Sequence, residues 1–187
     1  MAAKSPPARI LGIDPGTLRL GYGLIEARGS RLAFLDAGVL VAPASEPLES
    51  RLATLARGLR ALLEKHRPGE AAVEDVFVRN DPRAALSIGH ARGAVLAVLG
   101  EAGLAVASYA PATIKRAVAS NGRALKPQVA RMVGAILGLA SPTAPLDATD
   151  ALATAITHAL RTRAQALAGK GLSGRAGEAG AGGGPQG

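Results

Sequence analysis

The chain has 187 residues, of which 48% are hydrophobic and 19% charged, a composition that provides for one domain with a buried core and excludes disorder throughout. It contains no cysteine, which excludes disulfide bonds and thiolate zinc sites and agrees with a reducing compartment. The formal net charge of +8 and the pI near 10.8 favour a polyanionic partner.

Neither export nor membrane insertion is expected. The N-terminal stretch MAAKSPPARILGID lacks the apolar run of a signal peptide, and no uncharged run is long enough to span a bilayer. The sequence therefore predicts a cytoplasmic protein without a membrane anchor.

Most of the net positive charge lies in the middle of the chain. Residues 79–131 hold eight basic residues against two acidic ones. A solvated surface explains this bias as well as a phosphate-binding face does, so charge alone leaves both interpretations open. The basic residues are Arg79, Arg83, Arg92, Lys115, Arg116, Arg123, Lys126 and Arg131.

Hydrophobic periodicity predicts the elements in chain order. Short β-type runs separated by turn residues predict a meander of three strands over 9–14, 21–27 and 31–42. Apolar residues at helical spacing then predict an amphipathic helix over 46–66. The remaining elements are a strand, a mostly buried helix, a strand and further helices, over 71–78, 82–103, 104–110 and up to about 167.

This order predicts an α/β domain over residues 1–167, with a five-stranded mixed sheet and helices on both faces. Residues 168–187 are rich in glycine and have almost nothing to bury. They are expected to form a disordered tail.

Two acids fall on predicted strands. Asp14 ends the first strand and precedes a Pro-Gly turn, a usual place for function in a layered α/β fold, although Asp-Pro-Gly is also simply a good turn. Glu74 interrupts the fourth strand on the face that it shares with Ala72 and Val76. A carboxylate there is costly unless it is paired or holds a metal, whereas a surface strand would accommodate it.

Two further acids open a late helix. Asp147 and Asp150 are three residues apart, so both carboxylates project from one face of its first turn. Capping by Asp147 as N-cap and Asp150 at the third position explains them equally well. Taken with the two strand acids, however, they form the oxygen-rich set that a magnesium site on an α/β sheet requires. An acidic cluster in a basic chain suggests two-metal phosphodiester chemistry, with Lys and Arg holding the phosphates.

Five stretches resemble successive motifs of the RuvC family of bacterial Holliday junction resolvases. They cover roughly residues 8–160 in the order of that family. The resemblance implies an RNase H-like fold and a structure-selective endonuclease. The stretches are ILGIDPGTLRLGYGLI, AAVEDVFVRND, GHARGAVLAV, YAPATIKRAVASNGRALKPQVARMV and LDATDALATAITHAL.

The resemblance also assigns roles to individual residues. It implies that the catalytic and metal-binding acids are Asp14, Glu74, Asp147 and Asp150, with Lys115 and Lys126 contacting phosphates and assisting catalysis. Phe77 matches an aromatic residue used against bases near the crossover, although a Phe beside a strand end is otherwise usually core. Arg79 and Asn80 resemble a basic-Asn pair that the family carries one position later. The implied DNA-binding set is Phe77, Arg79, Asn80, Arg83, Lys115, Arg123 and Lys126.

The implied activity is paired, symmetric nicking of four-way DNA junctions in recombination and repair. The family implies two Mg²⁺ ions per active site, with Mn²⁺ as an alternative, a homodimer, and the branch-migration proteins RuvA and RuvB as partners. Two alternatives within the fold stay open: another RNase H-like nuclease acting on RNA/DNA hybrids, and a junction-binding module without cleavage. An actin-like ATPase is disfavoured, because that class needs a second phosphate loop and roughly twice this length.

The substitution Phe77→Leu separates the two interpretations of Phe77, because it keeps most of the apolar bulk and removes the stacking face. If Phe77 stacks on a base, junction cleavage should fall by about ten-fold or more with the melting temperature nearly unchanged. Cleavage rates and thermal melting of the same preparation check this. Full cleavage by the variant would reject the stacking role.

Overall fold

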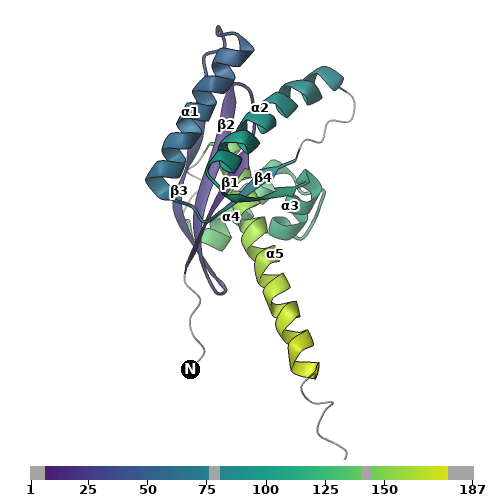
Figure 1. Ribbon diagram of the computed structural model, residues 1–187. Helices are drawn as coiled ribbons and strands as arrows, with labels where there is room; N and C mark the ends of the chain where they lie inside the picture. The colour runs from purple at the N-terminus through teal and green to yellow at the C-terminus, as the bar shows by residue number, and fades with distance from the viewer. Residues whose placement is uncertain (1–6, 76–80, 140–144, 177–187) are drawn as a thin grey trace, which may run out of the picture.

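The chain forms an α/β domain with one five-stranded sheet (Figure 1). This computed structural model describes residues 7–75, 81–139 and 145–176, with side chains described up to residue 168. Its elements in chain order are β1 (Ala8–Asp14), β2 (Arg19–Arg28), β3 (Arg31–Val41), α1 (Leu48–His66), β4 (Glu70–Glu74), α2 (Pro82–Glu101), β5 (Ala105–Tyr109), α3 (Pro111–Ala119), α4 (Lys126–Leu137) and α5 (Leu146–Ala176).

The strand order is β3-β2-β1-β4-β5. The first three strands are antiparallel to one another, whereas β1, β4 and β5 run parallel. The mixed five-stranded sheet that the sequence predicts is therefore confirmed. Because β1 and β4 are parallel neighbours in the centre, their carboxyl ends meet at the same edge of the sheet.

Two element boundaries differ by more than two residues from those predicted. The strand β4 ends at Glu74 rather than at residue 78, and residues 76–80 lie outside the described part of the chain. The helix α5 continues to Ala176, so the first part of the tail expected to be disordered is helical. Good helix formers in RTRAQALA, residues 161–168, carry the helix to the start of the tail, whereas the following helical residues include three glycines that local propensity does not favour. The division into a domain and a tail stays a prediction.

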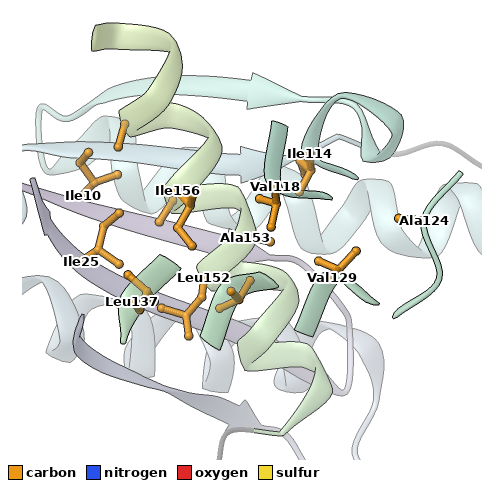
Figure 2. Packing of buried hydrophobic residues seen from close by; sticks show 13 residues of the cluster. Ile10, Ile25, Ile114, Val118, Ala124, Val129, Leu137, Leu152, Ala153 and Ile156 are labelled. Carbon is orange, nitrogen blue, oxygen red and sulfur yellow. The ribbon is translucent and has the colours of Figure 1, made fainter. Parts of the chain in front are cut away.

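Helices cover both faces of the sheet, as predicted (Figure 1). One face packs on α1 and α2 through a core that includes Leu11, Ile13 and Leu24. The other face packs on α3, α4 and α5. Figure 2 shows Ile10 and Ile25 from the sheet beside Ile156 of α5 in this second core. Alternation along β1 therefore places Asp14, which has the parity of Ile10, on the α5 face.

Helix α5 lies directly against the strands β1 and β2 because three glycines leave room for its backbone. A Cβ on Gly12 would clash with the carbonyl oxygen of Ala151, and one on Gly23 would lie 2.6 Å from the backbone nitrogen of Leu152. A Cβ on Gly21 would clash with the carbonyl oxygen of Asp147. The glycine row thus determines how closely the start of α5 approaches the sheet.

A hydrogen-bonded chain connects α5 to β4 and β5. The Tyr109 hydroxyl lies 2.8 Å from Nδ1 of His158, and Nε2 of His158 lies 2.8 Å from Oε2 of Glu70. Glu70 begins β4, and Glu74 ends it about 13 Å away. His158 follows Asp147 by eleven residues, about 16 Å along the helix, which is too far for both to bind one metal ion. Among the described helices, none is both long and apolar enough to cross a membrane.

The substitution Gly12→Ala should push α5 away from the sheet, because the added methyl group meets helix backbone rather than a flexible side chain. We expect a loss of about 3 kcal/mol in the free energy of unfolding. Urea denaturation checks this against Gly69→Ala as a control, since nothing lies within 4 Å of a Cβ at Gly69. Equal stability of the two variants would contradict the close packing.

Candidate active site

The two central parallel strands bring Asp14 and Glu74 to one end of the sheet. Ile13 pairs with Val73 in the parallel register. Asp14 and Glu74, which follow them, therefore lie level with each other. Both acids project toward the face that α5 covers, because both follow a residue buried on the α1–α2 face. The sequence predicted that Glu74 shares the face of Ala72; Val76 lies outside the described residues.

Helix α5 delivers the other two acids from its first turn. It begins at Leu146, so Asp147 lies inside the helix and is not its N-cap. The Asp147 carboxylate instead accepts a hydrogen bond at Oδ2 from Nε of Arg19, at 2.6 Å. The capping alternative for Asp147 is therefore wrong. Sequence reasoning missed Arg19, although alternation from Gly21 would have placed it on the same face of β2.

Two lysines border the acids from α3 and α4. Nζ of Lys126 donates a hydrogen bond to Oδ2 of Asp150 at 2.8 Å. Lys115 lies on α3 and lines the same pocket. This pocket has a volume of about 270 Å³ and is lined by Asp14, Glu74, Pro111, Ile114, Lys115, Lys126, Val129, Asp150 and Ala153. Five of the six predicted catalytic residues thus line one cavity. Asp147 does not line it, but its charge raises the pKa of Asp14, so it lies nearby.

Burial and the neighbouring acids raise the pKa values of Asp14 and Glu74. Burial, together with the charges of Asp14 and Asp150, raises the pKa of Glu74 to about 8. Burial and the charges of Asp150 and Asp147 raise the pKa of Asp14 to about 6, against an opposing effect of Lys126. The hydrogen bond to Asp150 raises the pKa of Lys126 above its ordinary value. In the absence of a bound cation, the lysines therefore do not fully balance the negative charge of the acids at this site.

The remaining predicted DNA-binding residues lie outside this pocket. Arg83 is exposed in the first turn of α2, and Arg123 is exposed in the connection between α3 and α4. Neither lines the cavity. Phe77, Arg79 and Asn80 lie outside the described residues.

Carboxylates thus lie at the ends of two central strands and in the first turn of a helix on the same face of an RNase H-like α/β fold, beside two lysines. The family model described as "Crossover junction endodeoxyribonuclease RuvC" matches residues 10–158. The chain belongs to the RuvC family, whose members are DNA endonucleases that act at crossover junctions.

Relatives support this membership along most of the chain. A protein named crossover junction endodeoxyribonuclease RuvC from Azorhizobium caulinodans is 48% identical over 151 residues, covering 81% of this chain and 89% of that protein. One with the same name from Xanthobacter autotrophicus is 47% identical over 160 residues, covering 86% and 94%. The solved structure of T. thermophilus RuvC in complex with Holliday junction substrate has a TM-score of 0.79 at 36% identity, covering 84% of this chain and 96% of that one.

Nucleases of this family depend on a metal ion. The donor chemistry fits, because four carboxylates offer hard oxygen ligands and the raised pKa values of Asp14 and Glu74 show that a cation would be stabilising. No group of three or more His, Asp or Glu side chains in the described part of the chain is arranged to hold a metal ion, however. Asp147 and Asp150 are engaged by Arg19 and Lys126 instead. Full coordination would therefore require these side chains to move.

The raised pKa of Glu74 makes the stability of the metal-free protein depend on pH. An unfolded Glu ionises near 4.5 and the folded one near 8, so the unfolded state binds fewer protons between these values. The free energy of unfolding should therefore decline as the pH rises from about 4.5 to about 8, on the order of 2 kcal/mol. Denaturation in EDTA across this range checks the decline.

The variant Glu74→Gln should show a shallower decline, because its side chain does not titrate. Glu101→Gln is the matched control, since Glu101 is exposed and pairs with Arg60 on the far face. A decline as steep in Glu74→Gln as in Glu101→Gln would contradict the assignment.

Proposed function

We propose that this chain resolves four-way DNA junctions by paired symmetric nicks, using Asp14, Glu74, Asp147 and Asp150 as its catalytic acids. The observation that carries this proposal is the convergence of strand acids, a helix acid and two lysines on one pocket of a basic protein. An acidic centre surrounded by basic side chains suits a polyanionic backbone that is held by its phosphates and cut at one of them.

The proposed cofactor is Mg²⁺, with two ions per site and Mn²⁺ as an alternative. The four acids would hold the ions, which would lower the pKa of the attacking water and stabilise the departing oxygen. A hydrogen bond holds Lys126 beside Asp150, and Lys115 lines the same pocket from α3. Their positive charges would orient the scissile phosphate and offset its repulsion by the acids.

Further DNA contacts are proposed for the basic surface around the pocket. Arg83 and Arg123 are exposed and free to reach phosphates of the junction arms. Three residues a short distance after Glu74 in the sequence are proposed to contact the DNA strands near the crossover: Phe77, Arg79 and Asn80. Support for a junction substrate also comes from the T. thermophilus relative, whose structure is a complex with Holliday junction substrate.

We also propose that the protein works in the cytoplasm as a homodimer together with RuvA and RuvB. A two-fold dimer would place two active sites on two strands of like polarity, which symmetric nicking requires. The outer side of α2 suits a helix interface: Leu86 is 63% exposed, and no atom lies within 4 Å of a Cβ at Gly89 or Gly93. Sedimentation at micromolar concentration tests the dimer.

Substrate choice separates this proposal from a hybrid-specific nuclease and from a non-cleaving binder. The protein is incubated with a synthetic four-way junction, a linear duplex and an RNA/DNA hybrid, with and without Mg²⁺. Paired nicks in the junction alone support resolution. Cleavage of the hybrid alone, or junction binding without cleavage, would overturn it.

The substitution Asp14→Asn tests the role of the strand-end acid, because it keeps the shape and removes one negative charge. Junction cleavage should fall by orders of magnitude while the fold persists. Junction affinity in EDTA should hold steady or rise, most visibly at low salt, since one charge that repels the phosphates is gone. Cleavage gels, binding isotherms and melting curves measure the three quantities.

The matched control is Glu46→Gln, which makes the same charge change at an exposed position in a loop. It should cleave normally. A fully active Asp14→Asn protein would contradict the proposed mechanism. Modest destabilisation with near-normal cleavage would show that Asp14 serves only to form the turn.

A further inference from the structure

The four acids of the site fall into two pairs with different surroundings. Asp147 and Asp150, from α5, each make an ion pair with a basic side chain. Asp14 and Glu74, from the strands, make no ion pair with any residue in the described part of the chain, and both have raised pKa values. The helix acids are thus neutralised within the protein, whereas the strand acids are not.

The cation that neutralises Asp147 is Arg19, which lies within the first motif stretch but was assigned no functional role above. Arg19 is the first residue of β2 and lies on the α5 face with Gly21, beside which the Asp147 backbone sits. The short turn after Asp14 brings Arg19 to the end of the sheet where the acids gather. Arg19 does not line the catalytic pocket, so it reaches the site only through Asp147.

We propose that Arg19 is a positioning residue that holds Asp147 in the metal-free protein and is displaced from it when a divalent cation binds. This inference rests on the proposed role of Asp147 as a metal ligand. It accounts for two facts together: the carboxylates suit a cation, yet no three of the described ones are arranged around a common point. The guanidinium acts as a monovalent substitute that a divalent ion replaces.

The exposure of the pair makes this exchange inexpensive. The Arg19 side chain is 53% exposed and that of Asp147 is 31% exposed, so water screens their attraction. Ion pairs in such surroundings contribute little to stability and open readily. A divalent cation next to several carboxylates gains far more attraction than one exposed guanidinium, because their charges add at short range. Arg19 should therefore lower the apparent cation affinity by a small factor.

The test is the affinity of DNA-free protein for Mn²⁺, measured by isothermal titration calorimetry. Arg19→Gln should bind Mn²⁺ about two- to five-fold more tightly than the unmodified chain, because Asp147 no longer has a competing partner. Arg28→Gln is the matched control: Arg28 lies on the same strand and pairs with Glu26 at 2.8 Å, away from the site. Equal affinities for the two variants, or weaker binding by Arg19→Gln, would overturn the proposal.

A double-mutant cycle separates this inference from the assignment on which it rests. Asp147→Asn should weaken Mn²⁺ binding, and adding Arg19→Gln to it should then change nothing. If Asp147→Asn leaves Mn²⁺ binding intact, the ligand role of Asp147 fails and the inference fails with it. If Asp147→Asn weakens binding but Arg19→Gln alone does not strengthen it, only the role of Arg19 fails. Melting curves in EDTA verify that each variant is folded, which the exposure of Arg19 favours.

Discussion

The close approach of α5 to the centre of the sheet is the constraint on which the rest of the molecule depends. Gly12 and Gly23 are paired across β1 and β2, and Gly21 lies opposite Asp14. With no side chains there, the helix backbone replaces the first layer of core packing. The packing of α5 on these glycines therefore fills this half of the core and also brings the start of α5 to the end of β1. The same contacts thus pack the core and assemble the site.

Clustered carboxylates repel one another, and without a metal the protein reduces this repulsion differently for the helix acids and the strand acids. Each helix acid is near a flexible, partly exposed basic side chain, so its charge is offset at little cost. Burial raises the pKa values of the strand acids, so they retain protons to higher pH. A cation bound at this centre would supply the positive charge that protons otherwise supply, so its binding would release protons from Asp14 and Glu74.

The start and the middle of α5 have different roles. Asp147 and Asp150 lie among its first five residues, whereas His158, about three turns after Asp147, connects the helix to β4 and β5 through Glu70 and Tyr109. This second attachment fixes the rotation of the helix about its own axis, since a helix held at one end alone can turn. The half-buried imidazole therefore supports the direction in which Asp147 and Asp150 project without taking part in the chemistry.

The sequence by itself determined the order of the elements, the fold class and the identity of the candidate acids, because these follow from local patterns. Asp14 at a strand end, Glu74 on the face of Ala72, and two acids one helical turn apart are visible in short stretches of the chain. Only the tertiary structure decided which charges meet. Arg19 and Asp147 are 128 positions apart, and Lys126 and Asp150 are 24 apart. Such contacts depend on how α5 packs across the glycine row, and periodicity describes which face a residue occupies but not what lies opposite it.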